Sequence, residues 1–157
     1  MNVKSHLIST VPLSTGYYFI GGDIMSVSLA VLSTILVDID HFLDYVITQR
    51  RIDSPKKMMG SFNTLDVVRK NYFILHSWEI ITLFIITLFF YPSPSLIAIF
   101  TGYTFHLLLD QIFNVHLSGK YNVKNYYYFF FYRMSFNFDV LPLREKGLVI
   151  RAEDKIS

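Results

Sequence analysis

Histidine and acidic residues recur together in three apolar stretches of the sequence. Cysteine is absent, so imidazole and carboxylate are the only strong metal ligands that the chain offers. A divalent cation compensates several carboxylates and neutral imidazoles at once, and these stretches therefore predict a metal site. The ionisable residues of these stretches are Asp38, Asp40, His41 and Asp44 in the first, His76 and Glu79 in the second, and His106 and Asp110 in the third.

The spacing in the second and third stretches predicts that each pair shares one face of a helix. At about 100° per residue, His106 and Asp110 differ by about 40° around the helix axis. His76 and Glu79 differ by about 60° on the same assumption. Each pair is therefore predicted to address one point beside its helix.

The first stretch has a more demanding geometry. Asp38 and His41 are about 60° apart on a helix, whereas Asp40 points about 200° away from Asp38. Both acids address one centre only if the helix deforms or if two ions are bound. Asp44, close to the end of the same helix, is interpreted as a helix-end residue.

The composition indicates which kind of element holds these residues. Of the 157 residues, 52% are hydrophobic and 17% aromatic, and the mean hydropathy is positive. These values are typical of a chain embedded in a membrane, and the length favours a single domain. An Asp at mid-span costs about 2.5–3.5 kcal/mol, so several ionisable groups together require compensation.

Two predicted membrane helices lie in the second half of the chain. Within residues 71–109 the only formally charged residue is Glu79, and the run is interrupted at YPSPS, residues 91–95. Each side is about 18–20 residues long, which at about 1.5 Å per residue matches a bilayer core of roughly 30 Å. Ser93 is predicted to cap the second of these helices, with Pro94 in its first turn.

Two earlier helices complete the predicted bundle. One runs from Asp23, as N-cap, to about Gln49. Residues 5–22 are uncharged but contain Pro12 and several hydroxyls, which is typical of a kinked or partly buried membrane helix. A cleavable signal peptide is the alternative for this stretch, although no A-x-A-like site follows it. The expected fold is an all-α integral membrane four-helix bundle.

The basic residues predict how this bundle is oriented. Six of the fourteen Lys and Arg lie between positions 50 and 70, and seven lie from position 120 onward. Lys and Arg are retained on the cytoplasmic side when loops are short, so both termini are predicted to be cytoplasmic, in a multi-pass protein of the cell inner membrane. The candidate ligands then form one layer about 8–17 Å from the cytoplasmic ends of their helices.

The C-terminal part differs in composition from the helices before it. We predict a transmembrane metal-binding domain over residues 1–116 and a cytoplasmic or interfacial tail over residues 117–157. The tail contains YYYFFFYR, residues 126–133, which favours an aromatic-rich segment at the level of the lipid headgroups. A lid over a substrate is the alternative, and nucleic acid is disfavoured as a partner because basic residues are sparse.

Four motifs resemble those of a known family, in the same order along the chain. They are SHLI near the start, VDIDH at residues 37–41, LHSWE at 75–79 and GYTFHLLLD at 102–110, and the resemblance spans residues 5–113. The family is that of the membrane-bound metal-dependent hydrolases of bacterial and archaeal inner membranes, distantly similar to zinc-dependent phospholipases C. The resemblance implies a helical metal-binding bundle. It implicates His6, Asp38, Asp40, His41, His76, Ser77, His106 and Asp110.

The chain departs from the family pattern at two places. Many members have Pro before the first Asp of the DxDH motif, where this chain has Val37. Many also carry His-Arg-Gly-x-Thr before the His-Ser pair, where this chain has NYFIL at residues 71–75. The missing His-Arg is compatible with altered substrate contacts, with loss of catalysis, or with Glu79 replacing part of the site.

The predicted function is that of a metal-dependent hydrolase acting on a phosphoester or lipid-like substrate near the cytoplasmic face. Zinc suits mixed His and carboxylate ligands, and one or two ions are expected. Glu79 is predicted to be the general base or a partner of a liganding imidazole. The predicted ligands are His6, Asp38, Asp40, His41, His76, His106 and Asp110, with Asp38 or Asp40 bridging if two ions bind.

Two other classes of function remain open. A non-enzymatic protein could use the same metal to staple the bundle, and a closed coordination sphere would distinguish it from an enzyme with an open one. A cation or proton transporter is disfavoured because the polar residues crowd one side of the membrane. Membrane lipids are the predicted surroundings, while the substrate and the oligomeric state are left undetermined.

Overall fold

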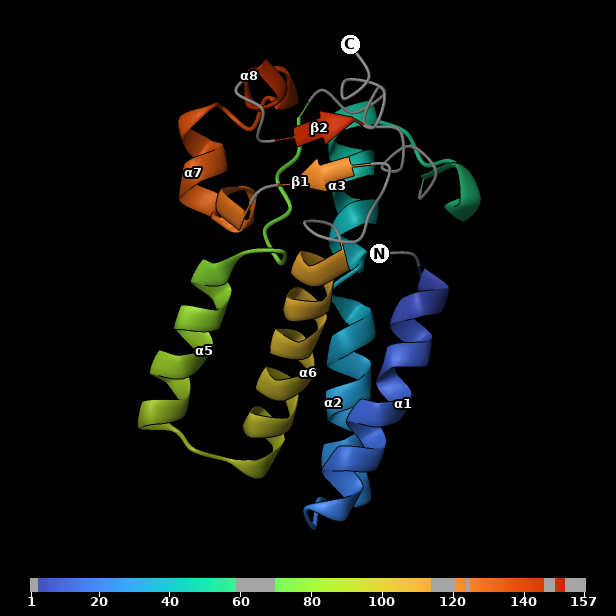
Figure 1. Cartoon of the computed structure of the whole chain (residues 1–157), viewed down its shortest axis with the longest axis vertical. Helices are drawn as coiled ribbons and strands as arrows, with labels where there is room; N and C mark the ends of the chain where they lie inside the picture. The colour runs from blue at the N-terminus through green and yellow to red at the C-terminus, as the bar shows by residue number, and fades with distance from the viewer. Residues whose placement is uncertain (1–2, 59–69, 114–120, 124, 146–148, 152–157) are drawn as a thin grey trace.

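The structure, a computed structural model, describes residues 3–58, 70–113, 121–123, 125–145 and 149–151. Within these residues the fold is mostly helical, which confirms the predicted all-α class (Figure 1). One small antiparallel sheet is an addition to that prediction. Its strands are β1 (Tyr121–Val123) and β2 (Val149–Arg151), with Asn122 opposite Ile150.

Four long helices run side by side in the main body of the molecule (Figure 1). They are α1 (Val3–Phe19), α2 (Ile24–Leu36), α5 (Trp78–Phe90) and α6 (Pro94–Gln111). A further helix, α3 (Ile39–Gln49), continues the direction of α2 toward the end where the C-terminal elements lie. α1 begins at the end of the bundle that faces those elements.

The helices α2 and α6 have the N-caps that the sequence predicts. The Asp23 carboxylate accepts a hydrogen bond of 2.6 Å from the Ser26 N–H at the start of α2. Ser93 accepts the Leu96 N–H at 3.2 Å, and Pro94 follows as the first residue of α6. These side chains satisfy N–H groups that the first turn of a helix cannot satisfy internally.

α2 and α6 approach so closely at Gly102 that no side chain fits between them. An added Cβ at Gly102 would lie 1.9 Å from the Ala30 carbonyl oxygen and 2.2 Å from Ser33 Oγ. Across the same contact, Thr34 donates its hydroxyl to the Gly102 carbonyl at 3.1 Å. Glycine is therefore a requirement of this helix spacing, which sets the distance between the residues that follow on both helices.

The helix predicted over residues 23–49 is interrupted at Val37 and Asp38, between α2 and α3. The backbone there closes with i→i−3 hydrogen bonds, from the Asp40 N–H to the Val37 carbonyl at 3.1 Å and from the His41 N–H to the Asp38 carbonyl at 3.2 Å. Such bonds tighten the turn relative to an α-helix and rotate the residues that follow. After this deformation both acids of the motif contact the His76 ring, Asp38 on the Nε2 side and Asp40 on the Nδ1 side.

The third predicted helix begins later than expected. α5 starts at Trp78, and residues 71–77 form a non-helical segment before it. The prediction that His76 and Glu79 share one helix face is therefore wrong. In this segment the N–H groups of Phe73 and Leu75 bond to carboxylates of α3, and the His76 N–H is shared between the Asp40 carboxylate and the Phe73 carbonyl.

The C-terminal elements form a layer over residues 70–79, which we call the C-terminal layer (residues 125–145). They are η2 (Asn125–Tyr128), α7 (Phe130–Ser135) and α8 (Val140–Glu145). The Asn71 N–H bonds to the Phe138 carbonyl at 3.0 Å, and Tyr128 is buried in one apolar core with residues of α5 and α6. The domain boundary predicted at residues 116 and 117 lies outside the described residues, but this part of the predicted tail packs on the bundle.

Within the described residues, one helix is long and apolar enough to cross a membrane. It comprises α2 and α3 taken together, Ile24–Gln49, with 26 residues. α5 is apolar but has 13 residues. That corresponds to about 20 Å, which is shorter than a bilayer core of roughly 30 Å. The structure thus supports one candidate span where the sequence predicts four.

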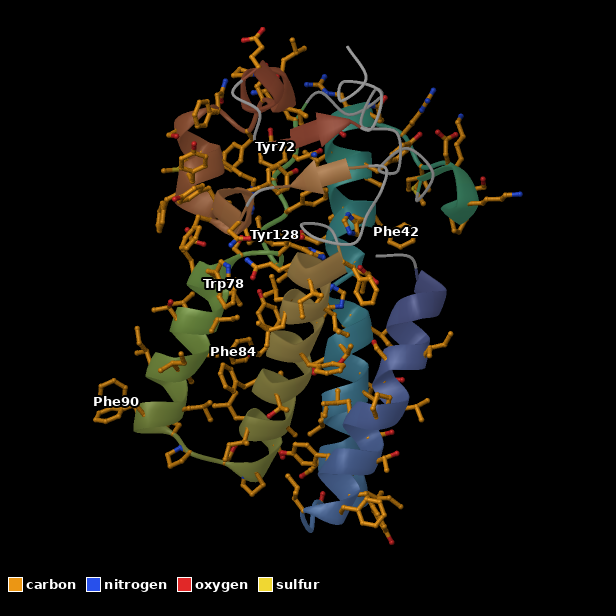
Figure 2. The ribbon with its side chains drawn as sticks, viewed as in Figure 1. Phe42, Tyr72, Trp78, Phe84, Phe90 and Tyr128 are labelled. Atoms are coloured by element: carbon orange, nitrogen blue, oxygen red, sulfur yellow. The ribbon has the colours of Figure 1, made fainter. Side chains whose placement is uncertain are left out.

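Large apolar side chains on the bundle point outward. The exposed fractions of Phe19, Ile24 and Phe89 are 80%, 84% and 82%, and all three lie at the end opposite the C-terminal layer. Figure 2 shows Phe90 directed away from α5, while Phe84 lies between α5 and α6. Contact with water is unfavourable for such surfaces, so these faces are suited to apolar surroundings.

Candidate metal centre

α6 carries two candidate ligands on one face. His106 and Asp110 lie one turn apart, and His106 Nε2 is 3.6 Å from Asp110 Oδ2. Both side chains are buried, His106 fully. Residues four apart are neighbours on a helix surface, so the pairing predicted from their spacing is confirmed.

His76 reaches the same point from the segment before α5. Its Nε2 atom lies 3.3 Å from His106 Nε2 and 3.5 Å from Asp110 Oδ2. The His76 and His106 rings meet edge to face, with their centroids 5.2 Å apart. Three donor atoms from two separate segments therefore converge.

Asp38 adds a fourth donor atom from the break between α2 and α3. Its Oδ1 atom lies 3.7 Å from His106 Nε2 and 3.9 Å from His76 Nε2. The tightened turn at this position directs the carboxylate toward α6 and toward the segment before α5. The centre is thus assembled from three parts of the chain.

The spacing of three of these atoms fits a tetrahedral cation, and the fourth, Asp38 Oδ1, lies slightly further away. Zinc bound to nitrogen and oxygen at about 2.0–2.2 Å has its ligand atoms about 3.3–3.6 Å apart when the geometry is tetrahedral. Five of the six distances among Asp38 Oδ1, His76 Nε2, His106 Nε2 and Asp110 Oδ2 lie between 3.3 and 3.9 Å. Two imidazoles and two carboxylates could therefore surround a dication with small adjustments, and the carboxylates would balance its charge.

His41 lies at the outer side of this group. Its Nε2 atom is 3.7 Å from Asp38 Oδ1, and its ring packs edge to face on Phe73, with centroids 4.8 Å apart. Asp38, His41 and His76 form a second set of donors close enough to share an ion. His76 belongs to both sets, and a neutral imidazole offers one nitrogen lone pair, so His76 serves one ion. A single ion with His41 as an additional donor is the simplest occupancy, and a second ion would require bridging by Asp38.

Asp40 contacts the His76 ring at Nδ1, whereas the other donors lie near Nε2. Its Oδ2 atom lies 3.4 Å from His76 Nδ1 and accepts the N–H groups of Leu75 at 2.6 Å and of His76 at 3.2 Å. A proton on Nδ1 is then shared with the carboxylate, which leaves the Nε2 lone pair for a metal. In this geometry Asp40 orients the candidate ligand His76, whereas the sequence predicts Asp40 itself as a metal ligand.

One side of the group is more open than the other. The side chains of His106, His76 and Asp110 are 0%, 5% and 5% exposed, whereas those of Asp38 and His41 are 13% and 20% exposed. Approach from outside the protein is therefore easiest on the side of Asp38 and His41.

Asp44 and Glu79 have contacts that support the backbone. Asp44, predicted as a helix-end residue, is 1% exposed, and its Oδ2 accepts the Phe73 N–H at 3.0 Å. Glu79, predicted as the general base, accepts the first two N–H groups of α7, from Phe130 at 2.9 Å and from Phe131 at 3.1 Å. Both oxygens of Glu79 are thus directed at α7, and among the described residues neither donor set includes it.

Two further predicted residues complete the comparison. The backbone of His6 belongs to α1, but its side chain lies outside the described part of the chain, so its role as a ligand stays a prediction. Ser77, implicated by the family resemblance, is buried and donates its hydroxyl to the Phe73 carbonyl at 3.1 Å. Its hydroxyl therefore supports the backbone that carries His76.

Reasoning from the sequence missed two buried residues that support the segment around His76. Arg133 is fully buried and donates to the Phe73 carbonyl and to the Ser77 hydroxyl, both at 2.8 Å. Tyr103 of α6, 4% exposed, donates its hydroxyl to the Leu75 carbonyl. A signal for Arg133 exists, because it is the only formally charged residue within the aromatic-rich run of residues 125–138. The same signal, an isolated charge, singled out Glu79.

Comparison with known proteins assigns no family to this chain. No family model, no curated protein and no solved structure matches the sequence. The site is therefore defined by its own geometry, as a buried group of histidine and aspartate side chains that could hold a metal ion.

Proposed function

We propose that this chain is a membrane-embedded, metal-dependent hydrolase acting on a phosphoester or lipid-like substrate near the cytoplasmic face. One observation carries the metal part: four donor atoms from three segments converge at spacings of 3.3–3.9 Å. The hydrolytic part is supported by the more open side of the group and by the resemblance of four motifs to the membrane-bound metal-dependent hydrolases.

Zinc is the metal that this donor set favours. Magnesium and calcium prefer six or more oxygen ligands, whereas zinc accepts a tetrahedral mixture of imidazole and carboxylate. Zinc in this site would act as a Lewis acid. With His76, His106 and Asp110 as its protein ligands, the fourth position, on the side of Asp38, would be open to a water, and zinc would lower the pKa of that water toward 7. The chain's own carboxylates, Asp38 and Asp110, would in turn be relieved of the cost of burial without a counter-charge.

The residues around the centre have distinct roles in this proposal. Asp38 and His41 line the side from which a substrate would approach. Asp40 fixes the orientation of the His76 ring through Nδ1. Glu79 supports the site by holding α7, a role that its two backbone hydrogen bonds favour over that of a general base.

We propose further that the bundle spans the inner membrane with the C-terminal layer at the cytoplasmic face. The candidate span Ile24–Gln49 and the exposed apolar side chains at the opposite end support this placement. Four exposed basic residues follow α3 at the end of the C-terminal layer, as expected for a cytoplasmic loop. They are Arg50, Arg51, Lys56 and Lys57. Because α1 begins at that end too, both termini would be cytoplasmic.

A non-enzymatic protein whose metal staples the bundle is the second candidate. The near-complete burial of His76, His106 and Asp110 favours it, because structural metal sites are closed. A metal that joins three segments would also stabilise the fold directly.

Metal content and turnover of the detergent-purified protein separate these candidates. We expect about one zinc per chain in the wild type and none in His106→Ala. Leu107→Ala is the matched control, since it removes a fully buried side chain from the same helix without removing a donor, so it should lower stability but retain zinc.

Turnover is measured with phosphomonoesters and phosphodiesters, in solution and in phospholipid vesicles. Hydrolysis that a chelator abolishes and zinc restores supports the hydrolase. Full zinc content with no hydrolysis, and a melting temperature that falls on chelation, favours the stapling role. A wild-type protein without bound metal contradicts both candidates.

A further inference from the structure

The segment that carries His76 (residues 72–77, the His76 segment) lacks helical support. The other three donor residues adjoin or belong to helices α3 and α6. The N–H groups of Phe73, Leu75 and His76 bond to the carboxylates of Asp44 and Asp40, and the His76 N–H also bonds to the Phe73 carbonyl. A metal ligand must be held within about 0.5 Å of its productive position, so the placement of His76 depends on side chains from elsewhere in the chain.

Arg133 of α7 binds the carbonyl edge of the His76 segment. Its Nη2 atom donates to the carbonyls of Tyr72 at 3.1 Å and Phe73 at 2.8 Å, and to the Ser77 hydroxyl at 2.8 Å. Its Nη1 atom lies 3.5 Å from the His76 carbonyl. The planar guanidinium of arginine can donate to several acceptors in different directions. The compact ammonium of lysine does not reproduce this arrangement of donors.

Arg133 is itself held by neighbours of the same segment. Glu79, just beyond the segment in sequence, binds the first N–H groups of α7. The guanidinium lies over the ring of Tyr127, with 5.5 Å between Cζ and the ring centroid, and the Tyr127 hydroxyl accepts a hydrogen bond of 2.9 Å from the Asn71 amide. Burial lowers the pKa of Arg133, while the electrostatic influence of Tyr127 and of Glu79 acts in the opposite direction. An arginine stays charged in proteins, so the Arg133 guanidinium is a buried cation in contact with the His76 segment.

We infer that Arg133 is a positioning residue of the metal centre. Arg133 donates hydrogen bonds to carbonyl groups of the His76 segment, and Asp40 accepts hydrogen bonds from its N–H groups. Together the two side chains keep His76 Nε2 at 3.3 Å from His106 Nε2. The inference rests on the proposed function in that the ligand is a metal ion, but the placement of His76 by Arg133 is independent of any reaction. The C-terminal layer is thereby part of the site, although no donor in either set comes from its described residues.

Arg133→Lys and Arg133→Met test this inference in the full-length protein. Lysine keeps the charge without the fork, so both variants should lose about tenfold or more in zinc affinity, measured by competition with a chromophoric chelator. The d–d absorption of bound Co²⁺ should weaken as His76 leaves the tetrahedral set. Trp78, the only tryptophan, directly follows the segment, and its quenching by acrylamide in the metal-free variants should increase.

Asp23→Ala is the matched control, because it removes the N-cap of α2 at the far end of the bundle. It should lower the melting temperature without changing zinc affinity or Trp78 quenching. Equal losses of affinity in Asp23→Ala and Arg133→Lys, or wild-type affinity in Arg133→Lys, would overturn the inference. If Arg133→Met does not fold, Arg133→Lys decides alone. If the wild type binds no zinc, the proposed function fails, and Trp78 quenching still decides whether Arg133 positions the segment.

Discussion

Replacing Asp40 with asparagine tests whether Asp40 orients the His76 ring or binds the metal itself. Asparagine still offers an oxygen to the N–H groups of Leu75 and His76, but it removes the negative charge 3.4 Å from His76 Nδ1. A hydrogen bond to a charged group contributes roughly 1.5–3 kcal/mol, against roughly 0.5–1.5 kcal/mol for a neutral one. The midpoints of these ranges differ by about 1.25 kcal/mol, which corresponds to about an eightfold weaker metal affinity.

Asp44→Asn provides the matched comparison for this measurement. Asp44 lies one turn further along α3, is equally buried, and accepts a backbone N–H of the same segment, from Phe73 at 3.0 Å. Chelator competition at fixed pH and ionic strength should show less than about a threefold loss for Asp44→Asn. Equal losses in the two variants would refute the orienting role of Asp40. Complete loss of metal in Asp40→Asn alone would make Asp40 a direct ligand.

Three further perturbations have definite expected outcomes. Gly102→Ala should lower the melting temperature, because the added methyl group meets the Ala30 carbonyl at 1.9 Å and overpacking costs about 1–3 kcal/mol; an unchanged thermal unfolding curve would contradict the close approach. Glu79→Gln should keep the bound metal but speed proteolysis of the C-terminal layer, because the acceptor of two α7 N–H groups loses its charge, at a cost of about 1 kcal/mol. Lost hydrolysis with unchanged proteolysis would make Glu79 the general base. A reporter fused after Ser157 should be active in the cytoplasm, and activity of a reporter that works only outside it would reverse the topology.

Local patterns in the sequence were sufficient for the N-caps of two helices and for half of the centre. Asp23 and Ser93 were recognised as N-caps because a cap bonds to an N–H only three residues away. His106 and Asp110 were paired correctly because the geometry of a regular helix relates residues four apart. The residue types alone indicated a metal, since no cysteine competes with imidazole and carboxylate.

The directions of Asp38 and Asp40 were decided by the fold. Asp38 and Asp40 cannot face one centre from a regular helix, and the tightened turn at Val37 and Asp38 resolves the conflict by changing the helix itself. In the structure the two acids address opposite nitrogens of one ring, His76, with Asp38 on the Nε2 side and Asp40 on the Nδ1 side. Periodicity predicted that either the helix deforms or two ions are bound, but not where each carboxylate would point.

The start of α5 and the role of Arg133 were decided by tertiary contacts. An apolar run with a charge three residues after His76 satisfies the rules for a helix from residue 71, yet residues 71–77 are held out of it by Asp40 and Asp44 on one edge and by Arg133 on the other. These partners lie from 29 to 60 residues away along the chain. A sequence pattern indicates hydrogen bonds between residues that lie within one helical turn of each other. Bonds between distant segments depend on how the helices pack, and at this site they determine which nitrogen of His76 faces His106 and Asp110.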